Sequence, residues 1–346
     1  MADNPSDPIL MQDSQDGSRT GIFAMARQLW ADSARSEGND NQLWVSTTSK
    51  WSSINLRFSQ FPLPGHALEK DLHDLWFMYY HASKNISYDH PALTRLAFQL
   101  LQAQERGALS RRTLNDDTAE VAITSGGVIW TDLPFFVSDV TGFWLKDCAV
   151  MGAAQRLNFA TFLAKLASVG LVRNGLCGIA LIILRETLET PRQLGTIGDQ
   201  GKEEEDPNRS LQDLRISELL PAANAWLFEA GVKIIQLSDQ LWKNCSDDVG
   251  RVGTLCSAGT SDVTPSTGFS PSRWIFWLRR LEEVVQVARE AGDSNLAEYA
   301  SRLMDNMLLT VDERDSSVKR ELEASPGVVR YQPTVHELGM GIPLEM

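Results

Sequence analysis

The segment from Gly268 to Gly292 constrains the fold most, because its sequence specifies both ends of one helix. Ser270 can accept hydrogen bonds from the first free amides, and Pro271 loses no hydrogen bond at the first helical position. Gly292 can take the left-handed conformation that ends a helix. We therefore expect one helix between these two caps.

The predicted helix carries a single apolar stripe, because its apolar residues recur at steps of three and four. The stripe consists of Trp274, Trp277, Leu278, Leu281, Val284, Val285 and Ala288. Burying each of the larger side chains stabilises a fold by roughly 1.5 to 3 kcal/mol. We expect the stripe to face another layer of helices, and indoles exposed to water would contradict this architecture.

Similar spacing predicts further helices along the chain. They are expected over residues 21–35, 67–84, 91–107, 153–169, 175–189 and 211–242, after Pro134 and after Gly292, with Pro221 and Gly231 as candidate breaks. Residues 44–61 are ambiguous, because their composition favours extended structure although their periodicity is poor. Short loops between consecutive helices predict antiparallel hairpins. The sequence therefore predicts an all-α fold, either an irregular α-solenoid or a helical bundle built from antiparallel helical hairpins.

The domain organisation follows from where the apolar periodicity starts and stops. We predict one helical domain over residues 21–314, interrupted by a mobile acidic loop at 191–210 and a polar loop at 246–267. Residues 1–20 are expected to be a disordered tail, and residues 315–346 an extended or disordered C-terminal tail. No copy of the hairpin recurs at a fixed period, so a regular repeat array is not predicted.

Charge and apolar content limit the partners and the compartment. A net charge of -13 repels phosphate backbones and anionic lipid headgroups, so neither nucleic acid nor a membrane is an expected partner. The most apolar run, Gly175 to Leu184, is too short to span a bilayer, and the first residues lack the features of a signal peptide. The four cysteines have no metal-ligand spacing and indicate a reducing environment. We expect a cytoplasmic protein, with the nucleus as the alternative.

Motifs of common enzymes are missing from the sequence. It has no phosphate-binding P-loop, no dinucleotide glycine pattern, no His-Glu-x-x-His and no nucleophile elbow. We therefore predict no cofactor and no metal, assign no catalytic residue, and leave open whether the protein is an enzyme.

Two groups of polar residues still deserve a chemical interpretation. Asp116 and Asp117 with Glu120 could hold Mg²⁺ beside a diphosphate, as in helical terpene cyclases, but no second metal-binding set follows; Asn115 and Asp116 also fit a helix cap or turn. His73 lies one helical turn after Glu69 and near Trp76, Phe77 and Tyr80, an arrangement that could serve proton transfer beside an apolar substrate. The alternative is a boundary histidine with a solvent-exposed glutamate partner.

The segment Gly268-Phe269-Ser270-Pro271-Ser272-Arg273-Trp274-Ile275-Phe276-Trp277 and the two helices after Ala67 and Pro91 carry a family resemblance. Over about residues 51 to 309 the chain resembles a fungal helical family, domain of unknown function 3632. The resemblance implies a helical intracellular protein and an association of some members with genes for secondary metabolism. It supplies no catalytic residues.

Two functions remain as alternatives from the sequence. The first is a non-catalytic protein-interaction or scaffold module, indicated by the helical hairpins and the missing site motifs. The second is an accessory enzyme of cyclase or isomerase type that acts on an apolar small molecule in a fungal secondary-metabolite pathway, for which 10 Trp and 13 Phe could wall a cavity. The expected partners are accordingly another protein or an apolar small molecule.

Overall fold

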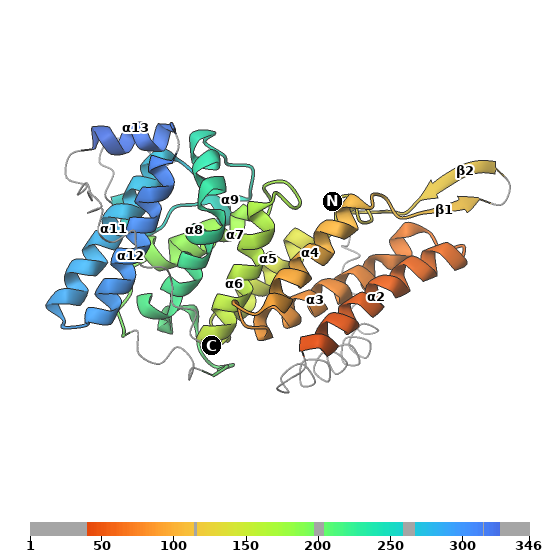
Figure 1. The fold of residues 1–346 in the computed structure, drawn as a ribbon, viewed down its shortest axis with the longest axis horizontal. Helices are drawn as coiled ribbons and strands as arrows, with labels where there is room; N and C mark the ends of the chain where they lie inside the picture. The colour runs from red at the N-terminus through yellow and green to blue at the C-terminus, as the bar shows by residue number, and fades with distance from the viewer. Residues whose placement is uncertain (1–39, 114–115, 197–203, 259–266, 314, 326–346) are drawn as a thin grey trace, which may run out of the picture. The chain divides into compact units, whose positions relative to one another are not determined.

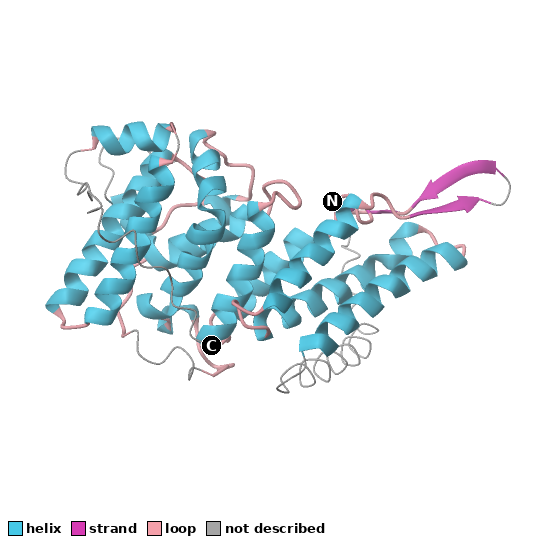
Figure 2. Cartoon of the chain, in the orientation of Figure 1, coloured by secondary structure: helices cyan, strands magenta, loops and turns pink. Residues whose placement is uncertain are grey.

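The computed structural model describes residues 40–113, 116–196, 204–258, 267–313 and 315–325, and nearly all of the regular structure there is helical (Figures 1 and 2). The chain divides into two compact units, residues 1–140 and 141–346. The predicted all-α fold of helical hairpins is confirmed. The predicted N-terminal tail 1–20 and first helix 21–35 lie outside the described residues.

Three long helices and two small hairpins make up the described part of the first unit. The elements are α2 (Asp40–Gln60), a 3-10 turn (Gly65–Leu68), α3 (Glu69–Asn85), α4 (Pro91–Glu105), β1 (Ser110–Thr113), β2 (Asp116–Val121), β3 (Ile123–Thr124), β4 (Gly127–Val128) and the start of α5 (Phe136–Asp147). Strand β1 pairs antiparallel with β2, and β3 pairs antiparallel with β4. Asp116 and Asp117 thus lie at the start of a strand rather than in a helix.

Helix α2 resolves the ambiguity of residues 44–61 in favour of a helix. Its buried residues Leu43, Thr47, Ile54 and Phe58 are spaced by four, seven and four, so they share one face. Thr47 takes part in this face, which is why apolar residues alone gave poor periodicity. Arg111 donates to the carbonyls of residues 58, 61 and 63 and so satisfies acceptors at the end of α2.

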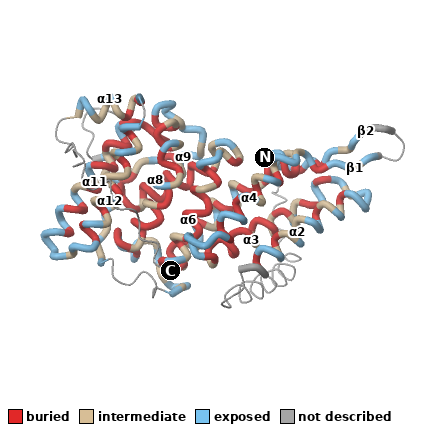
Figure 3. Tube along the Cα trace, viewed as in Figure 1, coloured by how far each residue is buried: buried red, intermediate tan, exposed pale blue. Residues whose placement is uncertain are grey.

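The second unit is built from layered helices. After α5 they are α6 (Ala153–Ser168), α7 (Cys177–Leu184), α8 (Ile216–Asp239), α9 (Asp247–Gly250), α10 (Thr254–Ala258), α11 (Pro271–Glu290), α12 (Ser294–Asp312) and α13 (Ser317–Ala324). All eight residues of α7 are buried, which confirms it as the centre of this core (Figure 3). A π-helical turn, Arg185–Glu189, continues α7. The polar loop predicted at 246–267 contains α9 and α10, and α8 runs unbroken through Pro221 and Gly231.

Cross-helix contacts show that α6, α8 and α12 run in the same direction. On α6, Arg156 meets the carbonyl of residue 218 and Lys165 meets Glu229, so both sets of numbers increase together. Asn224 bonds Tyr299 at 3.1 Å, and Gly231 faces residue 310 further along both helices. Neighbouring parallel helices with the chain returning between them are typical of an α-solenoid.

The α11–α12 hairpin confirms the helix specified by the sequence. Ser270 Oγ accepts from the Arg273 amide, Pro271 is the first helical residue, and Gly292 has a φ of 76°. Trp274 and Trp277 are both 0% exposed. The apolar stripe therefore faces inward, as predicted.

Two arginines hold the loop that connects α5 to α6. Arg156 donates to the carbonyls of Cys148 and Met151. Arg209 donates to the carbonyls of Ala149 and Met151, and the amide of residue 206 donates to the carbonyl of residue 150. The last residues of the predicted acidic loop 191–210 are thereby attached to the α5–α6 connection, and residues 197–203 of that loop lie outside the described residues.

Helix α13 shows that the expectation of an extended or disordered tail is wrong for residues 317–324, while residues 326–346 lie outside the described residues. Ser316 caps the helix by accepting from the amide of Lys319, and Asp239 accepts from the amides of Ser317 and Val318. Val318 is fully buried. Eight residues with a single fully buried apolar side chain give too little periodicity to predict the helix from sequence.

We expect Ser316→Ala to destabilise α13, because the first amides of the helix lose an acceptor. The cost of such a cap deletion is about 1 kcal/mol. Hydrogen exchange of the amides of residues 318–324 should therefore accelerate. Ser317→Ala is the matched control, since the Ser317 side chain does not cap the helix; equal acceleration in both variants would contradict the capping role.

Candidate functional site

The α3 face that carries His73 is the first candidate, and the structure changes its partners. Glu69 does not pair with His73: its carboxylate accepts from the Ser125 amide at 2.8 Å and from the Ser125 hydroxyl at 2.9 Å. These two hydrogen bonds lower the pKa of Glu69 below its ordinary value. The predicted pairing of His73 with a glutamate on its own helix is therefore wrong.

His73 pairs instead with Asp139 of α5, Nδ1 lying 2.6 Å from Oδ2. The Phe135 ring packs against the imidazole at a centroid distance of 4.6 Å. The side chain of His73 is 41% exposed and that of Asp139 is 15% exposed. The carboxylate thus fixes the orientation of an imidazole that solutes can reach.

The backbone beside this pair adopts uncommon conformations. Trp130, Leu133 and Phe135 have φ values of 70°, 46° and 64°, in the left-handed region that side chains usually avoid. Trp76 on α3 donates its indole N–H to the carbonyl of Pro134 at 2.8 Å and holds this segment in place. Such strain persists only where surrounding contacts enforce it, so the position of Phe135 over His73 is built into the fold.

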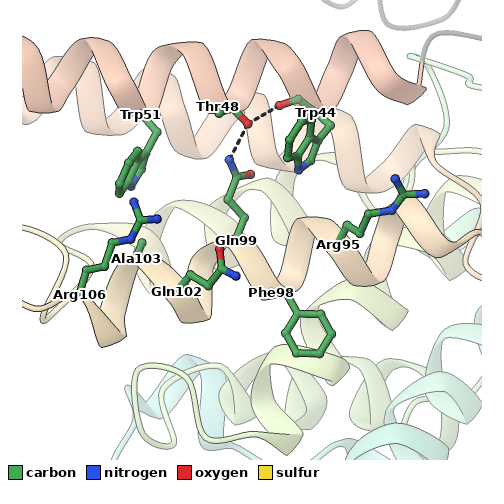
Figure 4. A pocket seen from close by; sticks show the side chains of 9 residues that line it. All are labelled: Trp44, Thr48, Trp51, Arg95, Phe98, Gln99, Gln102, Ala103 and Arg106. Carbon is green, nitrogen blue, oxygen red and sulfur yellow. Dashed lines mark hydrogen bonds between the residues drawn. The ribbon is translucent and has the colours of Figure 1, made fainter.

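A groove between α2 and α4 is a second candidate, which sequence reasoning missed. It has a volume of about 260 Å³ and is lined by Trp44, Thr48, Trp51, Arg95, Phe98, Gln99, Gln102, Ala103 and Arg106 (Figure 4). The spacing of residues 44, 48 and 51 places them on one helical face, and this signal was lost because the segment was not assigned to a helix.

The motif around Arg273 has an internal partner, the carboxylate of Glu189 at the end of the π-helical turn. Arg273 donates through Nε at 2.6 Å and through Nη2 at 3.1 Å, in the two-pronged geometry that suits guanidinium and carboxylate. Trp277 Nε1 donates to the same carboxylate at 2.7 Å, and the Gly253 amide also donates at 2.7 Å. Arg273 is 2% exposed and Glu189 is 0% exposed.

The remaining donors of Arg273 bind loop carbonyls, so the buried charge is fully engaged. Its acceptors are the carbonyls of residues 250, 251 and 268. A Cβ atom at Gly253 would approach within 2.5 Å of the Glu189 carbonyl, so only glycine permits this contact. The most distinctive residues of the sequence therefore close the fold and are inaccessible to a substrate.

The cysteines and the possible metal-binding side chains of the described residues were the remaining candidates. Burial raises the pKa of Cys148 and Cys177 to about 12 and that of Cys256 to about 11, so these thiols are not activated nucleophiles. Among the described residues, His, Cys, Asp and Glu do not gather into a group of three or more that could hold a metal ion. The side chains of Asp116 and Asp117 lie outside this description. None of the described helices combines the length and hydropathy needed to cross a membrane.

Comparison with known proteins places this all-α protein in a family. The model described as "Protein of unknown function (DUF3632)" matches residues 76–281. A relative from Penicillium oxalicum, "Oxopyrrolidines biosynthesis cluster protein G", is 35% identical over 293 residues, which cover 85% of this chain and 79% of the relative. No solved structure matches significantly. The chain belongs to the DUF3632 family, and the predicted family resemblance is confirmed.

Glu189→Gln tests whether the buried pair of Glu189 and Arg273 stabilises the fold. The substitution leaves the guanidinium of Arg273 buried without its counter-charge, and breaking a buried pair in this way typically costs 3 to 5 kcal/mol, so we expect a loss of about that size in the free energy of unfolding. Urea denaturation measures it. Adding Arg273→Met should recover part of the loss, because no unpaired charge then remains.

Glu298→Gln is the control, because Glu298 and Arg302 form an exposed pair. Its effect should stay within about 0.5 kcal/mol. Equal losses for Glu189→Gln and Glu298→Gln, or strictly additive losses in the double variant, would show that the buried pair does not hold the fold.

Proposed function

We propose that this protein is a non-catalytic interaction module that supports a secondary-metabolite pathway. The pathway assignment rests on the family and on the relative named as a biosynthesis cluster protein. The interaction role rests on one observation: α8 exposes Phe228 by 70% on the side opposite the core.

Two further apolar residues, one on α8 and one just after α6, are exposed to solvent like Phe228. Val232, one turn further along α8, is 41% exposed, and Val169 after the end of α6 is 59% exposed. The Lys165–Glu229 ion pair joins α6 to α8 beside them. Exposed apolar side chains beside an ion pair fit a protein partner, since aromatic side chains at the centre of an interface carry much of the binding energy.

Phe228→Ser should abolish or strongly weaken the binding of a partner that acts in the same pathway. The partner is sought by co-purification with the full-length chain from its native host. A candidate qualifies only if deleting the candidate's gene removes the same metabolite that is lost when the gene for this protein is deleted. Binding of the two purified proteins is then measured by calorimetry. A buried aromatic anchor predicts a loss of affinity of roughly 30-fold or more.

Val287→Ser on α11 is the matched control, because Val287 is exposed by 46% on another helix. It should leave the affinity unchanged. Full binding by Phe228→Ser, or repeated recovery of the protein alone, would contradict the interaction role.

The His73–Asp139 pair supports a second function, that of an accessory enzyme. When Nδ1–H donates to the carboxylate, Nε2 is the nitrogen that can accept a proton, so His73 would act as a general base. The Phe135 ring beside it would offer an apolar wall to a substrate. This pair carries the alternative because its imidazole is both oriented and reachable.

His73→Gln separates the enzyme from the interaction module. The variant is expressed in a strain that lacks the native gene. If His73 transfers a proton, the amount of pathway product should be at least about 100-fold lower than with the native protein, while the purified variant keeps the native melting temperature. The exposed residue His66 provides the control variant His66→Gln. Normal product formation with His73→Gln would eliminate this alternative.

A further inference from the structure

The groove between α2 and α4 has an indole and a guanidinium toward each end. In Figure 4, Trp51 and Arg106 lie toward one end, and Trp44 and Arg95 lie toward the other. Seven residues separate the two indoles on α2, which corresponds to roughly 10 Å along a helix. The two ends differ, because among the described residues that line the groove a guanidinium stacks on an indole only where Arg106 meets Trp51, and the groove therefore offers one organised site at that end.

The charge of the groove is opposite to that of the whole protein. Its lining contains two arginines and no acidic residue, although the chain carries a net charge of -13. Within the described part of the chain, neither Arg95 nor Arg106 forms an ion pair, so both guanidinium groups are available to a ligand. A local concentration of positive charge in an acidic protein selects anions.

The floor of the groove is fixed by the side chain of Gln99. Its amide donates to Thr48 at 2.8 Å, and its oxygen accepts from Tyr79 at 2.8 Å and from Thr47 at 3.3 Å. These partners come from α2 and α3, so one glutamine on α4 connects three helices. A ligand would meet a floor that is already formed, which lowers the entropy lost on binding.

Aromatic contacts also hold this site in place. The Arg106 guanidinium lies 5.0 Å from the centre of the Trp51 ring, and Trp130 packs against Trp51 at 5.4 Å. Trp130 is itself bonded to Asn55 of α2 at 2.8 Å. A stacked guanidinium keeps its edge free for the two oxygens of a carboxylate, so ring and cation can act on one ligand together.

We propose that this groove binds a small planar aromatic or conjugated carboxylate, with the acid group on Arg106 and the ring beside Trp51. The volume of about 260 Å³ lies just below the range typical of drug-sized ligands. A ligand of about two fused rings with one acid group fits within this volume. The binding goes beyond the interaction role proposed above and uses residues of the first unit only.

The test uses the full-length protein and two probes of equal shape, 2-naphthoate and the neutral 2-naphthamide. Titration calorimetry should show one site for 2-naphthoate and an affinity about tenfold lower for the amide, which lacks the charge that Arg106 pairs with. In ¹H–¹⁵N spectra the indole N–H of Trp51, assigned with Trp51→Phe, should shift on addition of 2-naphthoate.

Arg106→Gln should lower the affinity for 2-naphthoate by about tenfold and leave the affinity for 2-naphthamide nearly unchanged, because only the acid loses its charged partner. Arg302→Gln, which removes an exposed charge from α12, should change neither affinity. The proposal is overturned if both probes bind equally, if Arg106→Gln has no effect, or if about 1 mM 2-naphthoate gives no saturable binding.

Discussion

The buried pair of Glu189 and Arg273 is the interaction on which the second unit depends. Removing two charges from water is costly, and the cost is offset only when every donor and acceptor finds a partner. That condition is met here by the indole of Trp277, the amide of residue 253 and three loop carbonyls. The π-helical turn after α7, the short helices α9 and α10, and the start of α11 therefore meet at one point.

This arrangement gives the most distinctive segment of the sequence a structural role in place of a chemical one. An arginine and a tryptophan at such spacing would be plausible parts of a ligand pocket, yet both are buried against a carboxylate. The exposed features that suit recognition lie elsewhere: the groove and His73 on the first unit, and Phe228 on the second. The sites proposed for recognition thus lie on helix surfaces, away from the buried pair that holds the second unit together.

Local sequence signals were sufficient to predict a helix when its capping residues and its apolar stripe lie in one continuous segment. The α11–α12 hairpin is the clearest case, because Ser270, Pro271 and Gly292 act within one turn of the residues they terminate. Helix α2 was ambiguous because its buried face includes Thr47, and α13 is too short to show a period. In both, tertiary contacts decide the structure.

The spacing of residues in the sequence could not predict which polar side chains pair with one another. His73 and Asp139 are 66 residues apart, and Glu189 and Arg273 are 84 residues apart. A carboxylate one turn away on the same helix was the natural candidate for His73, but Ser125 already occupies it. Charged residues were visible in the sequence, whereas their pairing depends on how the helices fold back on one another.

The attachment of Arg209 to the α5–α6 connection has a consequence for how this chain can vary. On the other side of the acidic segment, the carbonyls of residues 193 and 194 accept from the amides of residues 216 and 217. The chain is thus fixed to the second unit at residues 193 and 194 and again at residues 206 and 209. The entropy of closing a loop between two fixed points grows only with the logarithm of its length, so a change in the number of residues between these anchors should cost little free energy.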